Sequence, residues 1–469
     1  MENVKKLLSD FCGRVVAYFF AFAFSVVFYH GCAFTFPIKF ADGDILTDSE
    51  VQEVLKLFID PMVRASGTKQ KIQFFLVNSA HVNAMASDTN IFINVGLIEK
   101  SSCAEELIGV LAHEIGHIVC NHSIQMLEAA KNSRSKSVIP ILIAAVVAGI
   151  TKDVSALGQG FIMANDVHSL SLCGFSRMQE SAADQFALSV LKKISWPTSG
   201  LERFIGYIAK TERSDDQNIY FRTHPVSSER LQHMKKNPYL EQKDISKNTK
   251  LPKNFEQLFQ IIKTKITAFT SPVSDAMQAV QNLKVNGDFK NYGMAIVNFR
   301  LGNTRCALES LNKFEMSAGG AFNKPFIQEI RAQILFEAGK MHDAIREIKL
   351  ALESRRSDQY MIQGAARIMV ESNCVDDISS AIRNIERVLF IKGSDMDAFT
   401  WQLLGRAYGK LNNHGRMRAC LAEFYAASGD IDRARKEAET AVKKLPKSDV
   451  YYKRAREIME ILPNSIDYR

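Results

Sequence analysis

One pentapeptide, residues 113–117 with the sequence HEIGH, constrains this chain more than any other segment. On an α-helix, side chains four positions apart lie on one face, so His113 and His117 point the same way one turn apart. Two imidazoles in this arrangement can bind one Zn²⁺, and the carboxylate of Glu114 can act as a general base on water at the metal. The segment therefore predicts a helix that carries two metal ligands and a base.

The same five residues have a simpler interpretation, in which the histidines form a surface pair or are buried and bonded to other polar groups. The surrounding helix argues against a solvated face, because most of its positions are apolar: Leu107, Ile108, Val110, Leu111, Ile115, Ile118 and Val119. A buried cluster of two histidines and a glutamate needs partners, and a metal ion provides them. We therefore favour the metal interpretation.

A third ligand is expected downstream, because catalytic zinc usually has three protein ligands and one open position. Glu180 and Asp184 are four residues apart, so both carboxylates share one helical face. The small residues between them, 181–183, would let that helix approach the first one closely. We predict that Glu180 is the third ligand and that Asp184 accepts the second ring N–H of a ligating imidazole. The alternative is a pair of solvated charges on an amphipathic helix.

Together, His113-Glu114-x-x-His117 and Arg177-x-x-Glu180-x-x-x-Asp184 resemble the gluzincin metallopeptidases related to the CAAX-prenyl and HtpX-type proteases. Further similarities lie at residues 83–86 and 91–97, at His122, and in Thr223-His224-Pro225 followed by Arg230. The resemblance covers residues 45–270, which we predict to be a zinc metallopeptidase domain. It implies an α+β fold, mostly α, with a small edge sheet beside the metal-binding helices.

The resemblance also implies roles for two residues of the downstream element. His224 either occupies the fourth zinc position as a switch or stabilises the transition state, and Arg230 supports the oxyanion. A simpler interpretation takes residues 223–225 as a loop before a helix, with Pro225 in the first turn. That interpretation explains the proline but not the histidine.

His122 is predicted to be structural rather than a ligand. It follows His117 by five positions, which on a continuous helix is about 500° of rotation. That rotation takes it away from the face shared by His113 and His117.

The segments 72–77 and 90–95 have the composition of β-strands. In related enzymes an edge strand near the cleft pairs with an extended substrate, a use of exposed main chain. The resemblance therefore makes Asn83 and Ala84 candidates for the border of a substrate groove.

The first 33 residues predict a signal peptide. Basic residues within 1–14 precede an apolar run at 15–29, and small residues at 31–33 favour cleavage after Ala33. Export would place the mature chain in the periplasm of a Gram-negative bacterium. The apolar run is short for a membrane span, and a retained anchor, as in an integral-membrane protease, is the alternative.

A second apolar segment, residues 138–150, lies between the two predicted metal-binding helices. It is too short to cross a bilayer without tilt, so we predict a buried hairpin or a peripheral membrane contact near the site. The net charge of +8, from 59 basic and 51 acidic residues, is modest. No basic stripe interleaved with aromatic residues points to nucleic acid.

From residue 284 onward the pattern becomes paired helices with a period of about 34 residues. The clearest unit spans 325–351 with Gly339 between its helices, and others begin at Trp401 and Leu421. The units resemble tetratricopeptide repeats, so we predict an α-solenoid over residues 284–465. An unrelated helical bundle is the alternative.

A leader, a gluzincin domain and such repeats together resemble a family of periplasmic proteases that act on outer-membrane β-barrel proteins. The resemblance implies a Zn²⁺-dependent endopeptidase that degrades misfolded or stalled outer-membrane proteins. Its repeats would bind these substrates or the β-barrel assembly machinery. The alternative is a chaperone or scaffold for outer-membrane protein assembly whose zinc site is mostly latent.

Overall fold

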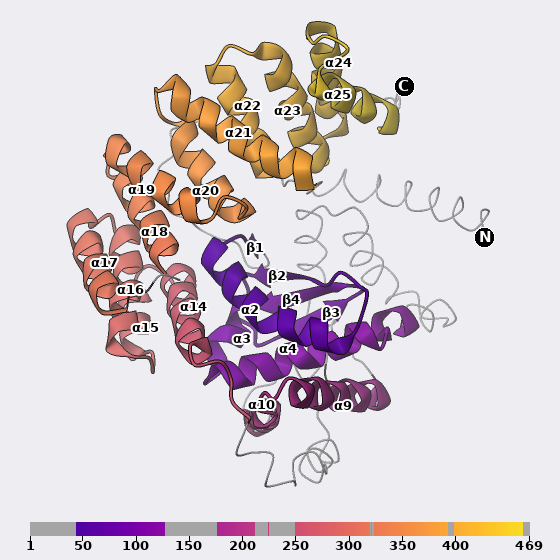
Figure 1. The fold of residues 1–469 in the computed structure, drawn as a ribbon, viewed down its shortest axis with the longest axis vertical. Coiled ribbons are helices and arrows are strands. Elements are labelled where there is room, and N and C mark those ends of the chain that lie inside the picture. The colour runs from indigo at the N-terminus through magenta and orange to yellow at the C-terminus, as the bar shows by residue number, and fades with distance from the viewer. Residues whose placement is uncertain are drawn as a thin grey trace.

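The computed structural model describes residues 44–126, 176–211, 224, 249–318, 320, 323–392 and 398–462. Predictions for residues 1–33 and 138–150 and for Arg230 lie outside these ranges. The described chain is mostly helical, with one small four-stranded sheet (Figure 1), which confirms the predicted α+β, mostly α, fold class. Among these helices none combines the length and the apolar character needed to cross a membrane.

The sheet has the strand order β1-β2-β4-β3. Its strands are β1 (Ile45–Leu46), β2 (Gln73–Val77), β3 (Ala84–Ser87) and β4 (Asn90–Asn94). β2 and β4 run parallel, whereas β1 pairs antiparallel with β2 and β3 antiparallel with β4. All five residues of β4 are buried, as expected for an interior strand. β3 is an edge strand and packs against the helix that contains residues 113–117.

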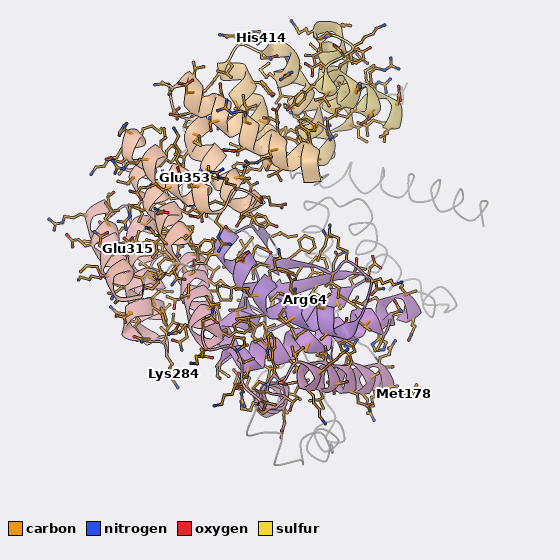
Figure 2. All side chains as sticks on the ribbon, viewed as in Figure 1. Arg64, Met178, Lys284, Glu315, Glu353 and His414 are labelled. Carbon is orange, nitrogen blue, oxygen red and sulfur yellow. The ribbon has the colours of Figure 1, made fainter. Side chains whose placement is uncertain are left out.

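That helix, α4 (Ala104–Val119), lies at the centre of the N-terminal part of the chain. Apart from Glu105, all its residues from 104 to 118 are buried, because neighbours cover it on several sides. These neighbours include β3 and the helices α2 (Ser49–Ser66), α9 (Arg177–Lys193) and α10 (Ser199–Thr211). Met178 of α9, 82% exposed, points outward (Figure 2).

Two glycines of α4 allow its neighbours to approach closely. A Cβ atom added at Gly109 would lie 2.5 Å from the backbone nitrogen of Leu201 in α10. One added at Gly116 would lie 3.0 Å from the carbonyl oxygen of Ala183 in α9. Backbone atoms cannot rotate aside as side chains can, so a larger residue would push the helices apart. Gly116 therefore helps to set the distance between α4 and α9.

We expect Gly109→Ala to lower the free energy of unfolding by about 1–3 kcal/mol, because the added methyl group must separate α4 from α10. Gly206→Ala in α10 is the matched control, since a Cβ atom there has no neighbour within 4 Å among the described atoms. Gly206→Ala should leave the free energy of unfolding unchanged or raise it by up to about 1 kcal/mol, because alanine favours a helix more than glycine does. Urea unfolding followed by circular dichroism measures both, and equal effects would contradict the close-packing explanation.

Helix α14 (Phe255–Thr270) contributes to two hydrophobic cores. One face packs in the core that includes α2 and α4, through Phe255, Leu258, Phe259, Ile262 and Ile266. The other face, with Ile261 and Ala268, packs with the helices that follow. The Glu256 carboxylate also accepts a 2.9 Å hydrogen bond from the backbone N–H of Ala104, the first residue of α4. α14 therefore packs in both cores and joins the two halves of the chain.

After the short helix α15 (Ala276–Asn282), the described residues up to 462 form five consecutive helix pairs that stack in chain order (Figure 1). They are α16 (Gly287–Arg300) with α17 (Thr304–Ala318), α18 (Lys324–Glu337) with α19 (Met341–Ser354), α20 (Gln359–Val370) with α21 (Val375–Lys392), α22 (Ala398–Lys410) with α23 (His414–Ala427), and α24 (Ile431–Lys444) with α25 (Val450–Ile461). Gly302 and Gly339, at φ of 75° and 74°, provide the left-handed residue in two of the turns. Assignment of these pairs to the tetratricopeptide family stays a prediction.

A buried polar cluster, here called the junction, fixes the helix pairs to α2. It comprises Asp48, Ser49, Glu50, Lys265, Tyr292, Glu329 and Asp358. Lys265 Nζ lies 2.8 Å from Asp48 Oδ2 and 3.1 Å from Glu50 Oε2. Tyr292 donates a 2.6 Å hydrogen bond to Glu50. Although burial favours a neutral amine, these carboxylates hold the pKa of Lys265 well above its usual value.

Candidate metal centre

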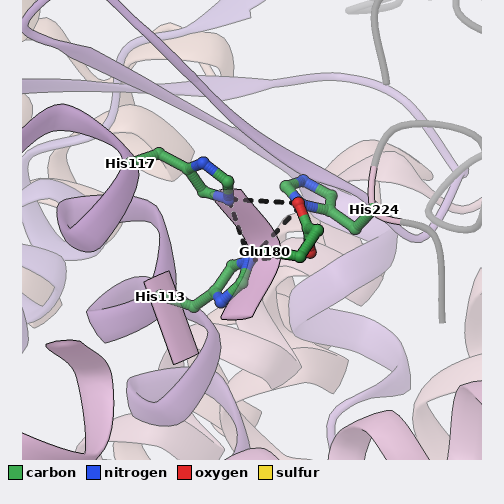
Figure 3. Close-up of side chains that lie close together, drawn as sticks. All are labelled: His113, His117, Glu180 and His224. Atoms are coloured by element: carbon green, nitrogen blue, oxygen red, sulfur yellow. Dashed lines mark hydrogen bonds and ion pairs between the residues drawn. The ribbon is translucent and has the colours of Figure 1, made fainter. Parts of the chain in front are cut away.

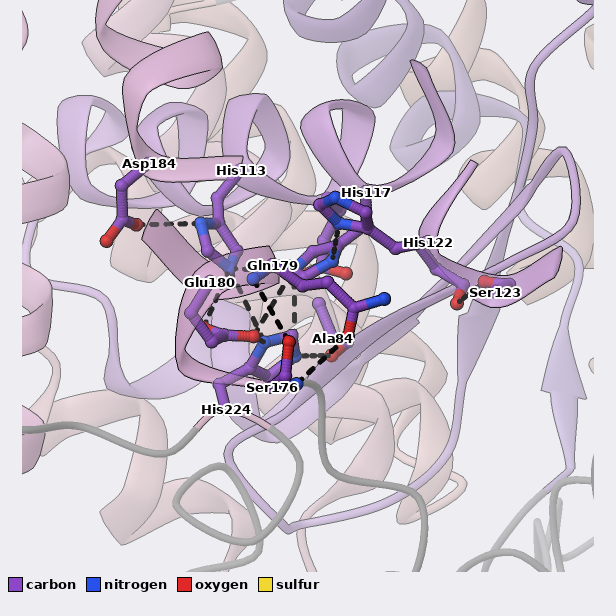
Figure 4. Close-up of polar contacts among 12 residues, drawn as sticks. Ala84, His113, His117, His122, Ser123, Ser176, Gln179, Glu180, Asp184 and His224 are labelled. Atoms are coloured by element: carbon purple, nitrogen blue, oxygen red, sulfur yellow. Dashed lines mark hydrogen bonds and ion pairs between the residues drawn. The ribbon is translucent and has the colours of Figure 1, made fainter. Parts of the chain in front are cut away.

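Helix α9 starts with a capping box that fixes the position of Glu180. The Ser176 hydroxyl accepts a hydrogen bond from the backbone N–H of Gln179, and the Gln179 side chain accepts one from the backbone N–H of Ser176. These bonds satisfy two donors at the start of the helix. Glu180 consequently lies in the first turn of α9, where its side chain reaches the histidines of α4 (Figures 3 and 4).

Four side chains, those of His113, His117, Glu180 and His224, converge at this point (Figure 3). Each offers one ligand atom, and these atoms all lie within 4.8 Å of one another. His113 Nε2 lies 3.0 Å from His117 Nε2 and 3.4 Å from Glu180 Oε2, and His224 Nδ1 lies 3.1 Å from Glu180 Oε1. All four residues are buried, with exposed fractions of 0–1%. No other group of three or more potential ligands occurs among the described residues.

The chemistry of these atoms fits a bound cation. Asp184 Oδ1 lies 2.9 Å from His113 Nδ1, and a carboxylate offers only lone pairs, so Nδ1 of the neutral ring carries the proton. In the neutral ring the Nε2 lone pair of His113 faces Glu180 and His117 Nε2, and a proton or a metal ion at this point removes the repulsion between them. Nitrogen and carboxylate donors of this kind suit Zn²⁺. The residues present therefore fit a metal ion.

Proton affinities at the site show that its carboxylates attract positive charge. Burial favours the neutral form of His113, but the carboxylates of Asp184 and Glu180 overcome this and raise its pKa to about 9. Burial also opposes ionisation of Glu180, yet His224 and the two histidines of α4 hold its pKa well below the usual value. The pKa of His117 is well below its usual value, mainly because the ring is buried. Glu180 is thus anionic beside a neutral His117, and a bound metal ion would take the place of the proton that the carboxylates hold on His113.

Glu114 lies beside the four converging residues. Its side chain is fully buried, and the backbone N–H of Ala86 is among the few groups that bond to its carboxylate. His224 Nε2 is 3.5 Å from Oε1, and burial raises the pKa of Glu114. A buried carboxylate with so few partners is costly unless water or substrate also bonds to it. Its position suits a base that takes a proton from water.

The edge strand β3 brings one of the two predicted groove residues to the site. The carbonyl oxygen of Ala84 lies 3.3 Å from His224 Nε2 (Figure 4). The carbonyl of Asn83 instead accepts a 3.1 Å hydrogen bond from the backbone N–H of Asn94, at the end of the neighbouring strand. The backbone of Ala84 therefore faces the site, whereas the Asn83 carbonyl bonds within the sheet.

His122 contacts the site, which the argument from helical rotation did not predict. That argument assumed one continuous helix, but α4 ends at Val119 and Asn121 has a φ of 55°. The reversal at Asn121 returns His122 to the ligand face, with its Nδ1 2.9 Å from His117 Nδ1. The sequence did contain a sign that the helix ends here, because asparagine adopts the left-handed backbone conformation more readily than most residues. His122 is not among the four converging ligands.

Comparison with known proteins supports this geometry. Residues 46–237 match peptidase family M48. The chain is 21% identical over 386 residues to the beta-barrel assembly-enhancing protease of Escherichia coli (strain K12), covering 79% of this chain and 74% of that protein. It is 28% identical over 171 residues to metalloprotease YcaL of the same organism, covering 36% of this chain and 63% of that protein. A putative beta-barrel assembly-enhancing protease of Vibrio cholerae is 26% identical over 189 residues, which is 38% of each chain.

The long alignment extends beyond the family M48 match, so it includes helix pairs as well as the metal centre. The family match and the converging ligands confirm the prediction of a metalloprotease. The chain therefore carries a peptidase family M48 domain at residues 46–237 and is homologous to beta-barrel assembly-enhancing protease.

Proposed function

We propose that this chain is a zinc-dependent endopeptidase of the periplasm of a Gram-negative bacterium, and that it degrades misfolded or stalled outer-membrane β-barrel proteins. The observation that carries the proposal is the convergence of His113, His117 and Glu180 beside the buried carboxylate of Glu114. The name of the E. coli relative, aligned over 79% of this chain, supports the substrate class.

In this proposal, His113, His117 and Glu180 hold Zn²⁺, and Asp184 orients His113 through its Nδ1–H. Bound zinc would supply Lewis acidity to the scissile carbonyl and lower the pKa of water. Glu114 takes the proton of the attacking water and passes it to the leaving amine. Arg230, outside the described residues, is proposed to support the oxyanion.

We propose that the substrate binds in an extended conformation along β3. The strand is an edge of the sheet, and the Ala84 carbonyl is directed to the metal centre. An extended peptide can add to such an edge through main-chain hydrogen bonds, which depend little on its sequence. Asn83 and Ala84 would then border the groove, as predicted.

The remaining segments would bring substrates to the site. A tetratricopeptide domain at residues 284–465 would bind unfolded outer-membrane proteins or the β-barrel assembly machinery. A signal peptide at residues 1–33 would direct export, and residues 138–150 would make a peripheral membrane contact near the metallopeptidase domain at 45–270. Nucleic acid is not expected as a partner.

Metal removal tests the proposed chemistry. We expect the purified protein to contain about one Zn²⁺ per chain and to cleave casein or an unfolded β-barrel precursor. A chelator should abolish cleavage and added Zn²⁺ should restore it, with metal content measured by mass spectrometry. Glu180→Gln should lose the metal, whereas Glu202→Gln in α10 should keep it. Cleavage by metal-free protein would overturn the proposal.

The geometry of His224 favours a second candidate function, a chaperone or scaffold with a mostly latent zinc site. His224 completes a set of four potential ligands, which would close the position that water and substrate need. This alternative predicts that Glu114→Gln fully complements a strain lacking the protein, whereas the proteolytic proposal predicts that it does not.

We expect His224→Ala to raise the rate of casein cleavage several-fold, because it frees the fourth ligand position. The rate of casein cleavage and the zinc content are both measured for the variant and for the wild-type protein. A loss of cleavage at unchanged zinc content would contradict the switch and would assign His224 to transition-state stabilisation instead.

A further inference from the structure

We infer that His122 is a positioning residue for the metal centre, and this inference rests on the zinc site proposed above. Its neutral imidazole accepts the Nδ1–H of His117 and thereby directs the Nε2 lone pair of His117 toward the metal. His122 does not touch the metal or the substrate in this arrangement.

The contact between the two rings is short and protected from solvent. His117 Nδ1 lies 2.9 Å from His122 Nδ1, and the ring planes meet at 71° with their centroids 5.0 Å apart (Figure 4). His117 is 0% exposed and His122 is 4% exposed. One nitrogen of this pair must therefore donate and the other accept.

Metal binding decides which nitrogen donates. His117 Nε2 is the atom that faces His113 and Glu180, so its lone pair is the one available to a cation. A neutral His117 with an unprotonated Nε2 carries its proton on Nδ1. Nδ1 of His122 must then be unprotonated and accept, which places the His122 proton on Nε2. The contact therefore fixes the tautomers of both histidines.

The two ligand histidines of α4 differ in the group that orients them. His113 Nδ1 faces the carboxylate of Asp184, which was predicted from sequence, and His117 Nδ1 faces an imidazole. Partners of this kind fix ring orientation and typically change metal affinity by about 10- to 100-fold. His122 thus has for His117 the role that Asp184 has for His113.

The backbone around His122 is held by contacts on both sides. The Asn121 side chain accepts a 3.2 Å hydrogen bond from the Gln70 amide. Ser123 Oγ donates a 3.1 Å hydrogen bond to the carbonyl oxygen of Ala86 in β3. The segment that carries His122 is therefore fixed to the edge strand that borders the metal centre, so the orientation of His117 is set from outside α4.

Zinc affinity of substituted proteins tests the inference. His122→Leu removes the acceptor, whereas His122→Asn retains one, because the amide oxygen of asparagine is attached to Cγ as Nδ1 is in histidine. We expect Zn²⁺ to bind His122→Leu about 10- to 100-fold more weakly than wild type, and His122→Asn within a few-fold of wild type. Competition with a chromophoric chelator measures each affinity, and the absorption spectrum of the Co²⁺ form reports ligand geometry.

The outcomes separate this inference from the proposed function. Tight zinc binding by wild type with equal affinity in His122→Leu would overturn the role of His122 and leave the zinc site standing. Failure of wild type to bind zinc would overturn both. Nuclear magnetic resonance of ¹⁵N-histidine in the zinc-bound wild type gives a readout that does not depend on a variant folding. An unprotonated Nδ1 on His122 supports the inference, and a protonated one refutes it.

Discussion

Glu114→Gln is expected to reduce peptide hydrolysis by at least about 100-fold, the low end of what a positioned general base contributes. The amide has almost the same shape as the carboxylate but cannot accept a proton from water. The amide oxygen of glutamine can still accept the hydrogen bond that the backbone N–H of Ala86 gives to Glu114, so the substitution should preserve local packing. Initial rates on casein and on an unfolded β-barrel precursor measure the effect.

The comparison needs a control that keeps the helix and the metal. Glu105→Gln changes an acid in the first turn of α4 that pairs with Arg203, more than two helical turns before Glu114, and should retain near wild-type cleavage. Zinc content should be unchanged in both variants, because neither residue is among the four converging ligands. Equal cleavage by wild type and Glu114→Gln would exclude Glu114 as the base.

Lys265→Met is expected to lower the free energy of unfolding by about 3–5 kcal/mol, the usual cost of removing one partner from a buried ion pair. Lys265 is 1% exposed and is the cation beside Asp48 and Glu50, while Glu329 and Asp358 lie nearby. Without its charge, these carboxylates must ionise next to one another or bind protons. Burial already raises the pKa of Glu329 to about 8.

Chemical denaturation monitored by circular dichroism measures this loss. Lys253→Met, at an exposed position just before α14, should change stability by no more than about 0.5 kcal/mol. Adding Glu50→Gln to Lys265→Met should recover part of the stability, because the double variant leaves one fewer uncompensated charge. An unchanged midpoint for Lys265→Met alone would show that the junction contributes no net stability.

The parts of the site that sequence reasoning identified depend on short-range spacing. The pairs 113/117 and 180/184 share helical faces by geometry alone, and in the structure they do lie on α4 and α9 and face one another. Periodicity and composition likewise place strands at 72–77 and 90–95, and the structure has β2 and β4 within these ranges. Local rules suffice wherever one regular element determines the neighbours.

Local rules could not predict contacts that depend on a backbone reversal or on segments far apart in the sequence. The contact between His122 and His117 requires the left-handed conformation of Asn121, which the assumption of a continuous helix excluded. The junction includes a hydrogen bond from Ser49 to Asp358, 309 positions away. Such a pair leaves no periodic signal in the sequence, because only the finished packing brings its members together.

The double role of α14 limits how this protein can be divided or recombined. Since one face belongs to the core of the metallopeptidase domain and the other to the core of the helix pairs, a break on either side exposes an apolar surface. The metallopeptidase domain and the helix pairs are thus connected by a helix that packs in both cores, and not by a linker. Exchanging the helix pairs for those of another protein would require a splice after α14 that also keeps Tyr292, whose hydroxyl bonds to Glu50 of α2.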